Sequence, residues 1–226
     1  MNLKSVFVIF WICFFGGSAE AQDTLKIVNH LHDYQQQLKG NPNMQLVEIV
    51  KAIPSVKLDI RYATKNNFTG VAVYSQARAF ARKPVVDALQ KVQEELKKQG
   101  LGLKIFDGYR PYAVTVKFWK VTPPDKKAFV ANPKAGSRHN RGCAVDLTLV
   151  DLKSGKALEM PTAYDSFSEA ASPTYQNVTP LQKKNRDFLI KIMENHGFTV
   201  FKNEWWHYDF NGWEEFPLMD IAFEKL

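Results

Sequence analysis

The connections between the predicted strands constrain the fold of this chain more than any other feature. Alternating apolar and polar residues predict strands at 56–60, 103–105, 144–149, 199–201 and 206–210. Several of the segments between them are too short to hold the crossover helix that joins two parallel strands. The sequence therefore predicts an α+β fold in which a mainly antiparallel sheet is flanked by helices.

Two helices have clearly marked ends. The first begins at Pro84, carries apolar residues at helical spacing and ends at Gly100, which follows the preference for proline at a helix start and glycine after its end. The second begins with a capping box formed by Thr179 and Gln182 and ends at Gly197. Two further helices are predicted over 112–121 and 25–38. No repeat or long linker divides the chain, so we expect a single domain.

The N-terminus has the pattern of a secretory signal peptide. Lys4 precedes an apolar run over 6–15, and small residues stand at cleavage-type positions up to Ala21. The apolar run is about half as long as the roughly 20 residues that span a membrane, which disfavours an uncleaved anchor. Cys13 follows a large apolar residue, which disfavours a lipoprotein. We therefore expect residues 1–21 to be removed on export, to the periplasm or, alternatively, to the medium.

Composition limits the partners and the covalent chemistry of the exported chain. The 226 residues are 45% hydrophobic and 23% charged, as in a soluble domain with its own core. The net charge of +7 suits anionic lipids or wall polymers, but lysines and arginines that only solvate the surface explain it equally well. Nucleic acid is not an expected partner outside the cytoplasm. Cys143 is the one cysteine beyond the signal segment, so no disulfide is expected within the mature chain.

A glycine-containing loop at 137–143 leads directly into the apolar strand at 144–149. Asp146 lies within that strand, where an unpaired carboxylate is costly to bury. It therefore needs a partner such as an arginine, backbone N–H groups or a metal ion. His139 lies in the loop, and Gly142 permits a turn that brings it back over the strand. We expect His139 and Asp146 to lie close together.

A second histidine and a second carboxylate occur far along the chain, in the sequence EWWHYDF that starts at Glu204. A catalytic zinc site can be formed by two neutral imidazoles and one carboxylate, with the fourth position left for water. His139, Asp146 and His207 supply these three ligands. Glu204 is then free to take the proton of the water and deliver it to the leaving amine. Because Glu204 and His207 would lie on opposite faces of a regular strand, we predict a bend at Trp205.

The sequence DGYRP, from Asp107 to Pro111, follows the predicted strand at 103–105 and places an arginine at its end. Arg110 is our candidate for stabilising the oxyanion that develops when a peptide carbonyl is attacked. A surface salt bridge between Arg110 and Asp107 explains the same residues equally well. Each of these patterns also occurs in ordinary structural residues, but in combination they indicate a zinc peptidase.

Several motifs carry a resemblance to a known family. They are SRHNRGCAVD at 137–146, DGYRP at 107–111, EWWHY at 204–208, and LDIRYAT followed by NFTG within 58–70. Together they resemble the zinc D-alanyl-D-alanine dipeptidases, which include the vancomycin-resistance dipeptidases and share the hedgehog and D,D-peptidase type of fold. The resemblance runs from about residue 47 to residue 210. Together with the signal-peptide pattern, it divides the chain into a signal peptide at 1–21, an N-terminal segment at 22–43 and a peptidase domain at 44–226.

The resemblance implies zinc-dependent hydrolysis of the D-alanyl-D-alanine dipeptide. It implies one zinc ion per chain on His139, Asp146 and His207, with Glu204 as general base and acid and Arg110 stabilising the tetrahedral intermediate. These roles agree with those argued above from the residues themselves. For an exported enzyme we expect a role in the turnover of cell-wall peptides, because the dipeptide it meets there is released from the wall.

Substrate recognition rests on the resemblance alone. It implies that Tyr62 and Asp165 bind the free amino terminus of the dipeptide and that Ser137 lies near its carboxylate. A D,D-carboxypeptidase that trims peptidoglycan stem peptides and a non-catalytic, zinc-stabilised wall-binding module are the alternatives. The expected partner is a small D-amino-acid dipeptide, with no protein partner and, after removal of the signal, no membrane span.

Overall fold

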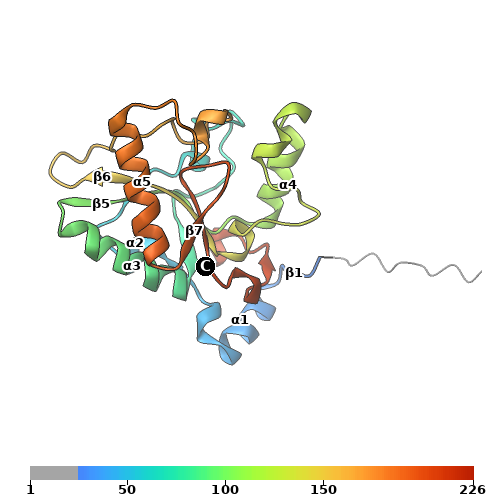
Figure 1. Cartoon of the computed structure of the whole chain (residues 1–226). Helices are drawn as coiled ribbons and strands as arrows, with labels where there is room; N and C mark the ends of the chain where they lie inside the picture. The colour runs from blue at the N-terminus through green and yellow to red at the C-terminus, as the bar shows by residue number, and fades with distance from the viewer. Residues whose placement is uncertain (1–24) are drawn as a thin grey trace, which may run out of the picture.

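The central sheet of the molecule has five strands in the order β3-β5-β6-β8-β7 (Figure 1). The computed structural model describes residues 25–226, and the predicted signal peptide at 1–21 lies outside them. The strands of this sheet are β3 (Lys57–Leu58), β5 (Leu101–Asp107), β6 (Ala144–Asp151), β7 (Phe198–Val200) and β8 (His207–Phe210). β3 pairs with β5 in parallel, and the other pairings are antiparallel. The predicted α+β fold is confirmed, but the mainly antiparallel sheet contains one parallel pair.

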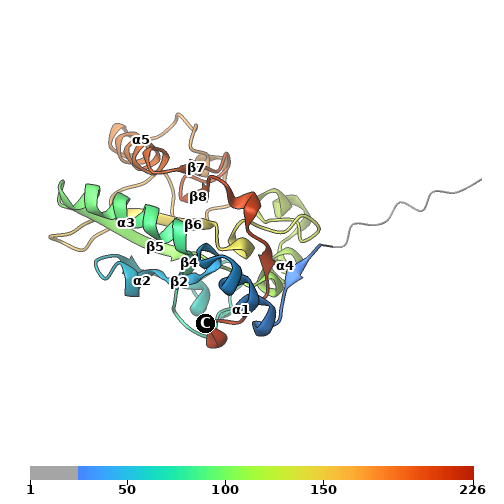
Figure 2. The same ribbon diagram turned by 90° about the horizontal axis from the view of Figure 1, so that it is seen from below.

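Helices cover the sheet and extend beyond it. They are α1 (Leu31–Gly40), α2 (Ile49–Ala52), α3 (Lys83–Lys97), α4 (Tyr112–Val121) and α5 (Pro180–Asn195). α3 packs against β5, and α5 packs against β6 and β7. α4 stands on the other side of the molecule from α3 and α5 in both views (Figures 1 and 2). Among the residues described, no helix combines the length and the apolar character needed to cross a bilayer.

The start of α3 is confirmed to within one residue, but α3 ends at Lys97, before the predicted stop at Gly100. The marked start of α5 is confirmed. In α5 the Thr179 hydroxyl accepts from the backbone N–H of Gln182 at 3.1 Å, and the Gln182 side chain accepts from the N–H of Thr179 at 3.0 Å. The helix predicted over 25–38 was wrong in its first part, because α1 begins only at Leu31. The residues before it form a short strand, β1 (Ile27–Val28), which pairs in parallel with β9 (Leu218–Met219).

Two further short strands support the loop that carries His139. β2 (Leu46–Glu48) and β4 (Phe80–Arg82) form an antiparallel pair. The N–H of Arg82 donates to the carbonyl of Gly142 at 2.9 Å, at the turn between the loop and β6. Neither β2 nor β4 was predicted from the sequence, because three residues give little room for an alternating pattern.

Candidate metal centre and active site

His139, Asp146 and His207 come together where β6 and β8 pair. The register of these two strands places Asp146 directly opposite His207. His139 opens a short 3-10 helix, and Gly142 at φ 71° then turns the chain back into β6. A Cβ at Gly142 would also lie 2.6 Å from a leucine side chain. The turn that brings His139 over the strand therefore requires glycine.

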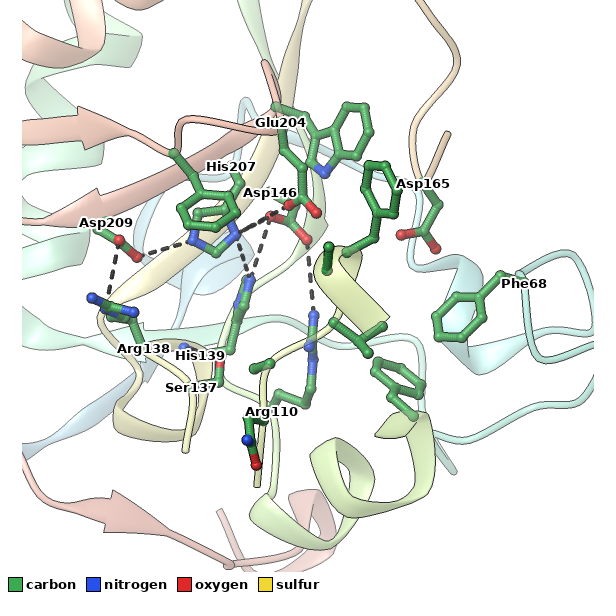
Figure 3. A pocket seen from close by; sticks show the side chains of 18 of the residues that line it. Phe68, Arg110, Ser137, Arg138, His139, Asp146, Asp165, Glu204, His207 and Asp209 are labelled. Carbon is green, nitrogen blue, oxygen red and sulfur yellow. Dashed lines mark hydrogen bonds and ion pairs between the residues drawn. The ribbon is translucent and has the colours of Figure 1, made fainter. Parts of the chain in front are cut away.

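The donor atoms of these three residues have the spacing of a tetrahedral metal site (Figure 3). His139 Nε2 lies 3.4 Å from Asp146 Oδ1 and 3.2 Å from His207 Nδ1. His207 Nδ1 lies 3.2 Å from Asp146 Oδ1. Ligands about 2.0 to 2.1 Å from a tetrahedral zinc ion are about 3.3 Å from one another. Asp146 Oδ1 is buried and has no hydrogen-bond partner among the described residues, so the donor set fits a metal ion.

Charge interactions within this group outweigh its burial. Burial by itself would raise the pKa of Asp146 and lower the pKa of His207. Contacts with the two imidazoles nevertheless hold the pKa of the Asp146 carboxyl well below its usual range. Burial by itself opposes the charged imidazole, but the neighbouring carboxylates of Asp146 and Asp209 raise the pKa of His207 to about 10. The centre is therefore built to accommodate positive charge.

Glu204 lies beside the three candidate ligands. Its Oε2 is 3.8 Å from His207 Nδ1. The N–H of His207 donates to the carbonyl of Glu204 at 3.3 Å, so the chain turns just before β8 and the predicted bend at Trp205 is confirmed. Burial raises the pKa of Glu204 to about 8, although the neighbouring His207 opposes this shift. A carboxyl with this pKa can both take up and release a proton near neutral pH.

Arg110 is held in the site by Asp107 and by an aromatic ring. Its Nε and Nη2 donate to Asp107 Oδ2 at 3.0 and 2.8 Å, and the Tyr74 hydroxyl donates to Asp107 Oδ1 at 2.8 Å. The guanidinium lies over the ring of Phe118, 4.8 Å from its centroid. Arg110 Nη2 is 4.0 Å from Asp146 Oδ2. The salt bridge to Asp107 exists, but it is buried and directs Arg110 towards the metal centre.

Asp165 lies across the cavity from Asp209 (Figure 3) and forms a separate polar group with Tyr62. The Tyr62 hydroxyl donates to both carboxylate oxygens of Asp165, at 3.0 and 2.8 Å. Among the described residues Asp165 is the one non-glycine with positive φ, at 64°. Such backbone strain clusters at functional sites. Burial raises the pKa of Asp165 to about 7, against the hydrogen bond from Tyr62.

Ser137 lies at the start of the loop that carries His139. Its hydroxyl accepts from the N–H of His139 at 3.2 Å, and its own N–H donates to Asn140 Oδ1 at 2.9 Å. Ser137 therefore helps to shape the loop as well as lining the site.

All of the predicted site residues line one cavity of about 210 Å³. They are Tyr62, Arg110, Ser137, His139, Asp146, Asp165, Glu204 and His207. Aromatic side chains, among them Phe68, Phe118 and Trp206, form much of its apolar wall. The structure thus brings together segments that are widely separated in the sequence.

Two further side chains contact the candidate ligands without having been singled out in the sequence. The Tyr164 hydroxyl donates to Asp146 Oδ2 at 3.0 Å, and Asp209 Oδ1 lies 2.9 Å from His207 Nε2. Strand alternation offers a signal for Asp209, because residues two apart in a strand share one face. Tyr164 lies in an irregular segment, where no periodicity indicates its direction.

Comparison with known proteins decides the family. Residues 42–220 match the family model described as D-ala-D-ala dipeptidase, Peptidase_M15. The chain belongs to this family. The resemblance read from the motifs is confirmed.

Relatives of this dipeptidase-family chain cover most of its length. The D-alanyl-D-alanine dipeptidase of Escherichia coli (strain K12) is 34% identical over 179 residues, which are 79% of this chain and 91% of that protein. The D-alanyl-D-alanine dipeptidase of Enterococcus faecalis (strain ATCC 700802 / V583) is 34% identical over 174 residues, 68% of this chain and 85% of that protein. A solved vancomycin-resistance D,D-dipeptidase, VanXYg, in complex with a D-Ala-D-Ala phosphinate analogue, is 20% identical with a TM-score of 0.37, over 73% of this chain and 55% of that one.

Proposed function

We propose that this member of the D-Ala-D-Ala dipeptidase family hydrolyses the D-alanyl-D-alanine dipeptide, with one zinc ion held by His139, Asp146 and His207. One observation carries the proposal. A three-donor metal centre, a carboxyl group suited to proton transfer and a separate carboxylate suited to an ammonium group converge in one cavity. The names of the relatives support the choice of substrate.

When bound, zinc would polarise the scissile carbonyl and lower the pKa of a coordinated water. The chain supplies the proton transfer through Glu204, whose carboxylate takes a proton from the attacking water and returns it to the leaving amine. Its pKa of about 8 allows both steps near neutral pH. Arg110, held by Asp107, presents positive charge to the oxyanion of the tetrahedral intermediate.

Asp165→Asn is expected to lower kcat/KM for D-Ala-D-Ala on the order of a hundredfold, because the buried ammonium of the substrate loses its counter-charge. Steady-state assays of the zinc-loaded protein measure this effect. Tyr62→Phe is expected to act in the same direction but less strongly, since Tyr62 holds Asp165 in place. Asp87→Asn, at an exposed carboxylate on α3, is the control. Unchanged turnover by Asp165→Asn would remove Asp165 from the proposal.

Binding of the dipeptide is expected to be strongest between about pH 7 and pH 8. Burial raises the pKa of Asp165 to about 7, so the carboxylate that pairs with the ammonium is lost as the pH falls below this value. The amino group of a peptide has a pKa of about 8, so the ammonium is lost as the pH rises above it.

Calorimetry with the Glu204→Gln variant isolates binding from turnover. The Kd for D-Ala-D-Ala should increase on both sides of this window, by up to about tenfold per pH unit. Adding Asp165→Asn should abolish the increase on the acid side. An acid-side increase that persists in the double variant would assign it to another group.

A comparison of three substrates separates the dipeptidase from its alternatives. We expect the zinc-loaded protein to cleave D-Ala-D-Ala but neither its N-acyl derivative nor a wall pentapeptide that ends in D-Ala-D-Ala. Equal cleavage of the blocked dipeptide would favour a D,D-carboxypeptidase. Zinc binding without cleavage of any of the three would favour a wall-binding module.

The place of this reaction is part of the proposal. The signal-peptide pattern at 1–21 supports export, so we place the enzyme in the periplasm, in the turnover of cell-wall peptides. Cell fractionation should find a form shortened by 21 residues outside the cytoplasm. Active full-length protein in the cytoplasm would contradict the proposed location.

A further inference from the structure

A carboxylate outside the predicted ligand set is attached to the metal centre. Asp209 Oδ1 lies 2.9 Å from His207 Nε2. Both residues belong to β8 and are two positions apart, so their side chains share one face of the strand. Pairing with β6 places His207 opposite Asp146 and Asp209 opposite Ala144. The strand register therefore fixes Asp209 beside His207, on the side away from Asp165 (Figure 3).

The two ring nitrogens of His207 face different partners. Nδ1 lies 3.2 Å from both Asp146 Oδ1 and His139 Nε2, so it is the nitrogen available to a metal. A neutral imidazole that binds a metal through Nδ1 carries its proton on Nε2. That Nε2–H points at Asp209, and a carboxylate that accepts this bond favours this tautomer and this ring orientation.

The other histidine of the centre is oriented by the backbone. His139 Nδ1 lies 2.7 Å from the carbonyl oxygen of Gly108, which leaves Nε2 for the metal. Because this partner is a backbone carbonyl, no side-chain substitution removes it. The corresponding partner of His207 is the side chain of Asp209, which a single substitution can remove.

Asp209 is itself held from its other side. Its Oδ2 lies 3.7 Å from Arg138 Nε, and the Asp209 side chain is only 15% exposed. The guanidinium of Arg138 lies over the ring of Trp213, 4.5 Å from the centroid. The contact with the ring restrains the guanidinium of Arg138, which keeps a positive charge beside the Asp209 carboxylate.

We propose that Asp209 is a positioning residue of the metal centre. It fixes His207 with Nδ1 free for the metal and with Nε2–H bound to the carboxylate, and Arg138 stacked on Trp213 holds Asp209 in place. This inference rests on the proposed metal site and adds a residue outside the donor set.

Zinc affinity is the first test. Asp209→Ala is expected to weaken zinc binding about ten- to a hundredfold, measured by competition with a chromophoric chelator. Asp209→Asn keeps an oxygen that can accept the bond from Nε2–H, so its loss should be smaller. Asp33→Ala removes the same charge at an exposed position on α1 and should bind zinc as the wild type does.

The imidazole N–H protons give a second readout, which a general loss of stability would not produce. In the zinc-loaded wild type, NMR should detect His207 with its proton on Nε2, shifted downfield by the bond to Asp209. Asp209→Ala should lose or shift this signal, whereas the N–H of His139 that faces Gly108 should keep its position.

Either of two results for the Asp209 variants would overturn the inference. The expected loss of zinc affinity in Asp209→Ala is about ten- to a hundredfold. If this variant binds zinc within about twofold of the wild type, the inference is overturned. An unchanged His207 signal in that variant would do the same. If Asp209→Ala does not fold, an unchanged affinity together with an unchanged signal in Asp209→Asn overturns it instead. A wild type that binds no zinc would refute the proposed function itself, whereas the other results leave that function standing.

Discussion

Glu204→Gln is expected to lower kcat for D-Ala-D-Ala on the order of a thousandfold, because the amide keeps the shape of the side chain but cannot transfer a proton. The side chain of Glu204 lies beside His207 and is only 12% exposed, and its pKa is raised to about 8. It lies outside the donor set of His139, Asp146 and His207. Zinc content should therefore stay at the wild-type level while turnover falls.

Single-turnover kinetics and metal analysis on the same sample measure both quantities. Glu215→Gln, at an exposed position near the C-terminus, makes the same chemical change away from the cavity and should be fully active. A loss of less than about tenfold in Glu204→Gln, well below what general acid–base catalysis contributes, would mean that another group moves the proton.

Asp146→Asn is expected to abolish activity through the loss of the metal. Asp146 supplies the only negative charge among the three donors, and its Oδ1 is buried without a hydrogen-bond partner among the described residues. An amide oxygen is a weaker zinc ligand than a carboxylate. Removing a group that only orients a metal ligand weakens metal binding by at most about a hundredfold. Asp146→Asn should weaken zinc binding by more than this, because it changes a ligand itself.

Metal removal and thermal unfolding check this prediction. Dialysis against a chelator should inactivate the wild type, and added zinc should restore its activity but not that of Asp146→Asn. Zinc should raise the melting temperature of the wild type, because a ligand that binds only the folded state stabilises it, and should leave that of the variant unchanged. Asp165→Asn serves as a carboxylate control that keeps its zinc. One zinc ion per chain in active Asp146→Asn protein would refute the ligand assignment.

The parts of the fold with strong local signals could be predicted. The starts of α3 and α5 follow from proline and from the Thr179 capping box. β1 and β9 are two residues each, and they form only because distant segments meet. The parallel pairing of β3 with β5 is likewise a long-range result, since alternation in a single strand contains no information about the direction of its partner.

The sequence by itself determined which groups are available for chemistry. His139, Asp146, His207 and Glu204 follow from local motifs, because metal binding and proton transfer depend on the type of side chain. Asp165 came from family resemblance alone, since nothing in its local sequence marks it.

Only the tertiary structure decided how these groups act together. It joined Tyr62 to Asp165 across 103 positions, buried the ion pair of Arg110 with Asp107, and placed Asp209 against His207. The reason is physical: the strength of a charge interaction depends on distance and on the exclusion of water, and both are set by contacts between segments far apart in the chain.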